Sequence, residues 1–184
     1  MGEHMSIIEE EEGLILKLQA FDMSAIESVF DQYNEAIYRY GYRLLGSQDK
    51  AEECVAETFS RFLHALKNGK GPKKYVRPYL YRMAHNWITD QYRRAIPEDE
   101  GLPEHHASQN DYPEDIVIDN IESQEIRNVL RALPESQRQA VVLKFLEGLE
   151  NQEIAIAMNK PVGAVKALQH RGLQTIRKKL EVKL

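Results

Sequence analysis

Residues 133–180 read LPESQRQAVVLKFLEGLENQEIAIAMNKPVGAVKALQHRGLQTIRKKL, and this stretch decides the fold of the second half of the chain. Its spacing predicts a helix over 136–147, a turn at Gly148 and a second short helix over 152–158. A long third helix is predicted from about Gly163, after a proline-containing break. Short helices that meet at a tight turn, with basic residues facing outward, are typical of a helix-turn-helix that reads DNA.

Apolar residues recur at helical spacing on the second and third of these helices. They are Ile154, Ala155 and Met158 on the second helix, and Val165, Leu168, Gly172, Ile176 and Leu180 on the third. Stripes of this kind mark the faces that pack against the rest of a domain. We therefore expect these faces to point inward and the basic residues to point outward.

The first half of the chain follows the same helical period. One helix ends at Gly46, a second begins at the N-cap residue Ser47 and stops at Asn68, and a third starts near Pro78. The stripe of the first of these helices comprises Ile26, Val29, Phe30, Tyr33, Ile37, Tyr40 and Leu44. No alternation of strand period and useful length occurs, so we predict an all-α protein.

Charge is segregated along the chain, although the formal net charge is −5. Residues 95–126 carry ten acidic side chains and no Lys or Arg, whereas 160–184 carry seven basic and one acidic, and 73–94 carry six basic and one acidic. Two basic helical blocks thus flank an acidic, proline-containing connector. The predicted organisation is an extension over 1–19, a helical domain over 20–95, a flexible linker over 96–120 and a helical domain over 121–184, with residues 1–5 resembling an expression-vector scar.

The composition excludes several classes of function. No run approaches the roughly 20 apolar residues of a membrane span, so we expect a cytoplasmic protein without membrane contact of its own. The single cysteine, Cys54, excludes an internal disulfide and a multi-cysteine zinc site, and its place on an apolar stripe predicts burial. His105 and His106 in the linker are too poorly preorganised for a metal site. With no nucleophile–base pair or phosphate-binding loop, we expect no enzyme, no catalytic residues, no metal and no cofactor.

Motifs in both predicted domains resemble those of the bacterial extracytoplasmic-function (group IV) sigma factors of the sigma-70 family. The residues that resemble sigma region 2 are 51–59 (AEECVAETF), 79–86 (YLYRMAHN), Asp90, Arg93 and Arg94, and those that resemble region 4 are 133–138 (LPESQR), 153–155 (EIA) and 163–166 (GAVK). The resemblance covers about 20–94 and 121–180, in the expected order and with the expected acidic linker. Each motif alone is weak, but two motif-bearing domains in this arrangement are a strong signal.

The resemblance implies a protein that binds core RNA polymerase, recognises the −35 and −10 promoter elements and promotes DNA melting. The implied partners are the β′ clamp helices and the β flap of polymerase, promoter DNA and an anti-sigma factor. For the acidic linker, the resemblance implies a path through the RNA exit of polymerase, while its charge alone is equally typical of a solvated tether.

Aromatic and basic side chains near the third helix suit the binding of single-stranded DNA, because stacking and phosphate neutralisation hold unpaired strands. By resemblance, the loop over 68–74 helps to capture a flipped base of the −10 element, and Asn86 contacts the melted junction. The implied −10 and melting residues are Lys73, Lys74, Tyr75, Arg77, Tyr79, Arg82, Asn86, Arg93 and Arg94, with Tyr81 as a further stacking group. Taken one by one, such tyrosines often only pack and such arginines often only solvate a helix.

The second helix carries the implied polymerase contacts, which are Glu52, Glu53, Glu57 and Arg61. An acidic helix face without a partner is usually only solvated. The family often has Asp at position 53 and Gln at position 56, whereas this chain has Glu53 and Ala56. The polar details of the polymerase contact are therefore expected to differ.

The third C-terminal helix is expected to enter the major groove of the −35 element. The implied −35 residues are Lys166, Ala167, His170 and Arg171 for base edges, with Gln152 and Lys160 for phosphates. The family more often has Thr at 164, Ser at 167 and Arg at 168, whereas this chain has Ala164, Ala167 and Leu168. Base preference is expected to depart from the common pattern, and Leu168 is expected to pack in the core.

Two other classes of function compete with the sigma-factor hypothesis. An operator-binding regulator would bind duplex DNA through the C-terminal helix-turn-helix and use the N-terminal domain for sensing or dimerisation. It would act without polymerase, often as a dimer on inverted half-sites. An interaction-only adaptor would leave the basic face from Lys166 to Arg171 without a task. The aromatic and basic third helix of the first domain favours the sigma-factor hypothesis, because a sensing domain has no need of it.

Overall fold

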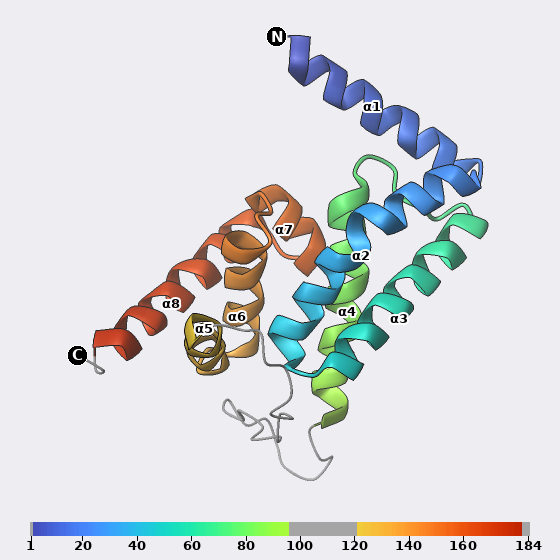
Figure 1. Ribbon diagram of the computed structural model, residues 1–184. Coiled ribbons are helices and arrows are strands. Elements are labelled where there is room, and N and C mark those ends of the chain that lie inside the picture. The colour runs from blue at the N-terminus through green and yellow to red at the C-terminus, as the bar shows by residue number, and fades with distance from the viewer. Residues whose placement is uncertain (1, 96–120, 182–184) are drawn as a thin grey trace.

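The computed structural model describes residues 2–95 and 121–181, and within them the side chains of 10–94 and 126–181. The first part forms α1 (Gly2–Gln19), α2 (Met23–Leu45), α3 (Gln48–Lys67) and α4 (Val76–Ala95). The second part forms α5 (Ile121–Arg131), α6 (Glu135–Val141), the π-helical segment η1 (Val142–Leu146), α7 (Asn151–Met158) and α8 (Val162–Glu181). Neither described range contains a strand, so the all-α prediction with two helical domains is confirmed (Figure 1). The linker predicted over 96–120, with His105 and His106, lies outside the described residues.

Local sequence signals set the ends of α2 and α3. The Asp22 carboxylate caps α2 by accepting from the Ala25 N–H at 2.9 Å, and the Ser47 hydroxyl caps α3 by accepting from the Lys50 N–H at 3.3 Å. Gly46 ends α2 with φ 67°, a left-handed conformation that costs glycine little. These caps hold α2 and α3 in an antiparallel pair on which α4 packs.

The first domain closes around an aromatic and aliphatic core. Tyr40, Phe62 and Tyr81 are almost fully buried, and the rings of Tyr40 and Tyr81 meet edge to face at 5.4 Å. Cys54 is also buried, as predicted, and burial raises the pKa of its thiol to about 12. A thiol with so high a pKa stays protonated and inert at neutral pH.

The N-terminal extension is more ordered than the sequence suggested. We predicted only an extension over residues 1–19, but α1 runs through it and buries Ile15 and Leu18 against the first domain. The missed signal was the helical spacing of Leu14, Ile15 and Leu18, which follow an acidic run. The extension therefore belongs to the fold of the first domain.

The second domain contains the predicted helix-turn-helix, with one departure. The helix expected over 136–147 changes at Val142 into the π-helical η1, which widens the last turn before Gly148. Gly148 (φ 67°) and Asn159 (φ 52°) supply the two left-handed turns that redirect the chain into and out of α7. Between them, α7 starts with a reciprocal capping box of Glu150 and Glu153.

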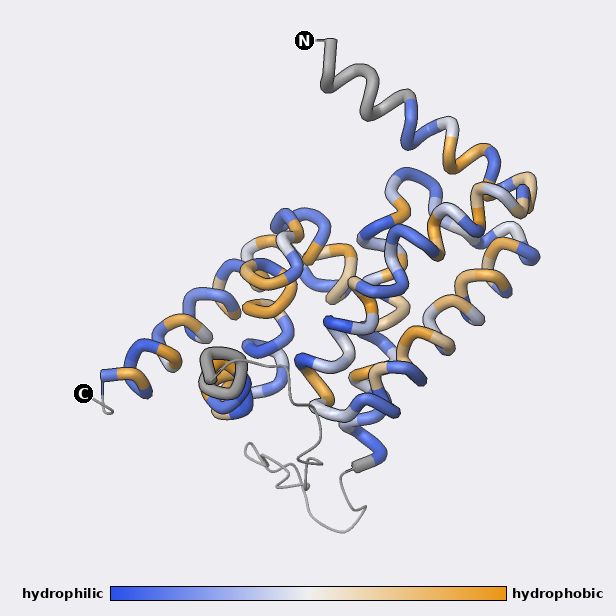
Figure 2. Tube along the Cα trace, in the orientation of Figure 1, coloured by the Kyte–Doolittle hydropathy of each residue, from blue (hydrophilic) through white to orange (hydrophobic). Residues whose placement is uncertain are grey.

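Most predicted core positions are buried or half-buried, and two are exposed. Val165 and Gly172 of α8 pack inward, and a Cβ on Gly172 would lie 2.7 Å from a methyl carbon of Val141, so α8 and α6 approach closely there. Leu180 is 48% exposed because the last turns of α8 extend past α6. Phe30 is 44% exposed because it lies at the open edge between α2 and α3. Apolar and hydrophilic residues otherwise alternate along the helices at the helical period (Figure 2).

The two domains lie against each other in the described parts of the chain. Figure 1 shows α7 between α8 and the first domain, and α7 packs directly on α4. Across the same junction Arg127 donates to the Tyr42 hydroxyl at 2.9 Å, and the guanidinium of Arg138 lies 5.4 Å from the ring centre of Tyr92. The predicted DNA-facing helix α4 therefore has one side on the second domain.

Candidate nucleic-acid interface

The loop before α4 and the outer side of α4 carry most of the predicted −10 residues. Exposed among them are Lys73, Lys74, Tyr75, Arg82, Asn86, Arg93 and Arg94, while Arg77 and Tyr79 are half-buried. The Lys74 ammonium lies 5.1 Å from the ring centre of Tyr75, so a cation and an aromatic face occur together in the loop. This pairing suits a strand whose bases stack and whose phosphates need neutralising.

Tyr81 does not belong to this exposed set. It was expected as a further stacking group, but it is 1% exposed and its hydroxyl donates to Glu147 Oε2 at 2.8 Å. Desolvation and the neighbouring Glu147 carboxylate raise the pKa of Tyr81. The prediction for Tyr81 was wrong because its ring packs in the core of the first domain and its hydroxyl is bound to the second domain.

Arg77 is also held by the second domain. Its Nη2 donates to the backbone oxygen of Glu147 at 2.5 Å, and its Nη1 lies 3.6 Å from Glu153 Oε2. Its guanidinium is thus already shared between two groups of the helix-turn-helix. Arg77 therefore belongs both to the predicted −10 residues and to the contact between the two domains.

Glu147 accepts hydrogen bonds from both Arg77 and Tyr81. Its side chain is 2% exposed and forms an ion pair with Arg43 of α2 in addition to accepting from Tyr81 of α4. A buried carboxylate is tolerated when it is paired and hydrogen-bonded in this way. We call Arg43, Arg77, Tyr81, Glu147 and Glu153 the domain clasp.

Beside the clasp, a polar cavity of about 730 Å³ lies between the domains. Its lining brings together residues predicted for three different contacts: Arg61 for polymerase, Asn86 and Arg93 for the −10 element, and Lys160 for the −35 element. His85 also faces this cavity, and burial followed by the Lys160 charge lowers its pKa to about 4. The imidazole is therefore neutral at pH 7, with Nδ1 3.4 Å from the Tyr40 hydroxyl.

Helix α8 presents the predicted −35 residues differently. Lys166, Ala167, His170 and Arg171 are all exposed on one side, while Val165 and Gln169 are buried on the other. The buried Gln169 amide donates to the Asn151 side chain at 3.0 Å and so ties α8 to α7. Leu168 is half-buried against the core, as expected. The predicted −35 residues of α8 therefore share one exposed side of the helix.

The predicted polymerase face lies on α3. Glu52 and Glu53 are exposed, and Glu57 and Arg61 are half-buried and paired at 3.3 Å. Glu53 is paired with Lys50 at 2.7 Å, so the face is less acidic than the sequence alone suggests. Helical spacing predicted that these residues share a face, but it gave no indication of these pairs.

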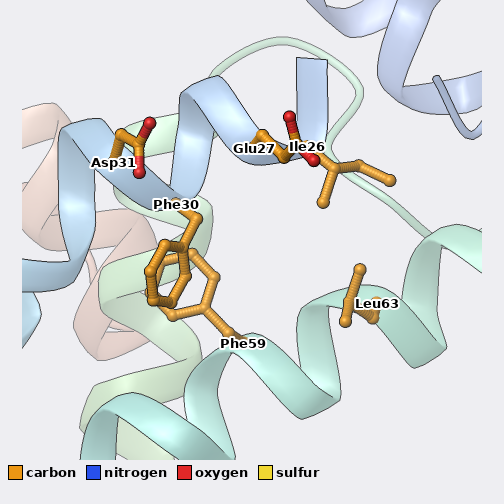
Figure 3. Close-up of a pocket in the computed structure, with 6 residues that line it drawn as sticks. All are labelled: Ile26, Glu27, Phe30, Asp31, Phe59 and Leu63. Carbon is orange, nitrogen blue, oxygen red and sulfur yellow. The ribbon is translucent and has the colours of Figure 1, made fainter. Parts of the chain in front are cut away.

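Sequence reasoning missed two features of these surfaces. The first is the clasp, since no local pattern links Glu147 to Arg43 or Tyr81. The second is an apolar pocket of about 320 Å³ between α2 and α3, where the exposed Phe30 ring meets Phe59 edge to face at 4.8 Å (Figure 3). Its signal was Phe30 itself, a large ring at the edge of the predicted stripe.

Comparisons with known proteins match both domains. The family model for Sigma-70 region 2 matches residues 29–96, and that for Sigma-70, region 4 matches 123–176. The ECF RNA polymerase sigma factor SigW of Bacillus subtilis is 32% identical over 177 residues, which are 90% of this chain and 94% of SigW. The ECF RNA polymerase sigma factor BldN of Streptomyces coelicolor is 30% identical over 168 residues, and the match spans 89% of this chain but only 63% of BldN.

Solved structures show the same fold. The structure of CnrH in complex with the cytosolic domain of CnrY superposes with a TM-score of 0.69 at 19% identity, over 95% of this chain and 99% of that chain. The sigma factor RpoE of Bartonella quintana, in complex with the anti-sigma factor NepR, gives a TM-score of 0.63 at 17% identity, over 86% of this chain and 98% of that chain. In the described part of this chain, no helix has the length and apolarity to cross a membrane, and no cluster of possible metal ligands occurs.

Proposed function

This chain belongs to the ECF sigma factors of the sigma-70 family, and we propose that it directs core RNA polymerase to promoters with −35 and −10 elements and promotes DNA melting. The observation that carries the proposal is the match of both sigma regions, in order, to two domains with exposed basic surfaces. It acts by binding and not by catalysis, and it works with polymerase in the cytoplasm.

The geometry supports a division of labour between the domains. The exposed side of α8 fits the major groove, where Lys166 and Arg171 reach base edges or phosphates. The loop over 68–75 and the exposed residues of α4 bind the melted −10 strand by stacking and by neutralising phosphates. Helix α3 offers Glu52, Glu53, Glu57 and Arg61 to the β′ clamp helices, and the second domain meets the β flap.

The domain clasp adds a requirement to this mechanism. Arg77 belongs to the proposed −10 surface and also bonds to the backbone of Glu147. Full engagement of the −10 strand therefore goes with release of the clasp. A protein that holds the domains together would oppose this release, and an anti-sigma factor is the partner that we propose for that role, since a sigma factor of similar fold is found in complex with one.

Run-off transcription tests this function directly. Core polymerase, with and without the purified chain, is given a library of upstream genomic fragments. We expect discrete transcripts only when the chain is present. Co-elution with core polymerase but no initiation on any fragment would overturn the proposal. Binding of duplex DNA as a dimer without polymerase would support the operator-binding alternative instead.

A further inference from the structure

Helix α4 is not preceded by one of the short polar residues that usually cap a helix, whereas Asp22 and Ser47 cap α2 and α3. The residue before α4 is Tyr75, whose hydroxyl lies too far along the ring to reach the nearby backbone N–H groups, and its first turn contains no acidic residue. That turn instead carries Arg77, whose positive charge is unfavourable near a helix N-terminus. The uncapped start matters because the proposed base-capturing loop leads directly into it.

A carboxylate from α1 supplies the missing cap. Glu11 Oε1 accepts from the Val76 N–H, the first of α4, at 2.8 Å. Glu11 lies at helical spacing from Ile15 and Leu18, on the face of α1 that packs inward, and α1 passes beside the loop that leads into α4 (Figure 1). Glu11 is half-buried, whereas its neighbours Glu10 and Glu12 are exposed. Of these three glutamates, Glu11 is therefore the one that packs inward.

The other end of the loop is fastened as well. The Tyr79 hydroxyl donates to the backbone oxygen of Lys70 at 2.5 Å. At Gly71 a Cβ would lie 2.5 Å from Leu66 Cδ2, so the backbone passes close over α3 there. A short segment held at Lys70 and at Val76 thus carries the exposed Lys73, Lys74 and Tyr75.

We propose that Glu11 is a positioning residue for −10 recognition. By capping α4 from α1, it fixes the segment that carries Lys73, Lys74 and Tyr75. The inference rests on the proposed function, because it assigns α1 a role in the capture of the melted −10 strand. It predicts that −10 preference depends on a residue that does not touch DNA. It also predicts that −35 preference does not depend on that residue.

Hydrogen exchange tests the anchor without reference to transcription. The full chain is compared with Glu11→Ala, Glu11→Gln and the exposed controls Glu10→Ala and Glu12→Ala. Loss of a typical helix cap should accelerate exchange over residues 70–78 about fivefold in Glu11→Ala. Glu11→Gln should restore part of the protection because its amide oxygen still accepts, and the controls should match the unmodified chain. Unchanged exchange in Glu11→Ala would overturn the anchor.

Transcription with core polymerase then tests the role. On a library randomised at the −10 element, Glu11→Ala should flatten base preference, Glu11→Gln should recover part of it, and a library randomised at −35 should give the same preference for every variant. Faster exchange with an unchanged −10 preference would overturn the positioning role. If the unmodified chain supports no initiation, the proposed function fails. Any change in hydrogen exchange would then assign Glu11 a role in the stability of the fold and none in −10 recognition.

Discussion

Helix α8 and helix α4 expose their predicted DNA contacts to very different degrees. On α8 the residues Lys166, His170 and Arg171 all face solvent, and the buried side of the helix packs on its own domain. On α4 the exposed residues share their helix with Arg77 and Tyr81, which are bound to the other domain. The predicted −35 surface is exposed, while the predicted −10 surface lies on a helix that also contacts the second domain.

This difference should affect the free energy that each step of promoter binding requires. Under the proposed function, duplex binding by α8 uses side chains that are already exposed. Under the proposed function, melting uses a helix that the clasp also holds, since Tyr81 of α4 and Arg43 of α2 both contact the buried Glu147 side chain. Changes on α4 should therefore affect strand opening more than initial binding, and changes in the clasp should affect the balance between closed and open domain arrangements.

The largest effect is expected when three exposed groups of the −10 surface are removed together. Replacing Tyr75, Arg82 and Asn86 with Ala should reduce open-complex formation far more than closed binding, since one stacked base alone is worth roughly 1–3 kcal/mol. All three are exposed, so the domain should stay folded. Permanganate footprinting measures strand opening.

The control for this triple variant replaces the exposed α2 residues Gln32, Glu35 and Arg39 with Ala. Equal opening by the control and the unmodified chain is expected. Unchanged permanganate reactivity in the Tyr75, Arg82 and Asn86 variant would contradict the assignment of this surface to melting.

A single substitution at Glu147 should weaken the domain clasp. Glu147→Gln removes the charge that faces Arg43 and should weaken the domain contact by about 3 kcal/mol. This value is at the low end of the range for breaking a buried ion pair, because Arg43 is partly exposed. Small-angle X-ray scattering should show a larger radius of gyration. The surface pair of Glu35 and Arg39 provides the control Glu35→Gln, which should change nothing. An unchanged radius in Glu147→Gln would show that the clasp does not hold the domains together.

Acid should lower the free energy of unfolding through His85. Its pKa is about 4 in the folded chain, against about 6.5 when unfolded, so the unfolded state takes up a proton first as the pH falls. Stability from this group is complete above pH 6.5 and declines toward pH 4, by about 2 kcal/mol between pH 7 and pH 5. Chemical denaturation at both pH values, compared with His85→Gln, measures this difference. A variant with the same pH dependence as the unmodified chain would exclude His85 as the cause.

Local patterns predicted much of the fold. Helical spacing identified the buried Ile154 and Val165, and turn chemistry placed Gly148 and Asn159 at the breaks around α7. Those features depend on neighbours within a few residues, where helix and turn rules apply directly. The change to η1 at Val142 was not predicted, because helical spacing does not distinguish a π-helical turn from an α-helical one.

Contacts between distant residues account for what the sequence did not indicate. Tyr81 was expected on the DNA surface because it is an aromatic residue among basic ones on the third helix. It is instead buried, with its ring on Tyr40 and its hydroxyl donating to Glu147 of the other domain. Glu11 lay in an extension to which no role was assigned, and its partner Val76 is on another helix. A charged or aromatic side chain on a predicted helix can face solvent or a second domain, and one sequence carries no information that separates the two.

The smallest effect, at single base pairs, is expected on α8. A well-placed Lys or Arg on guanine contributes roughly 1–3 kcal/mol of discrimination, whereas a phosphate contact weakens all sequences alike and lowers the salt slope by about one. Because Lys166 and Arg171 are exposed on the open side of α8, we expect each Ala variant to relax preference at one or two −35 base pairs while the domain stays folded. Transcription from a randomised −35 library measures this, with Lys178→Ala in the last turn as the control. A uniform loss on all sequences, with an unchanged order of preference, would assign both side chains to phosphates and leave base reading to His170 and the DNA shape.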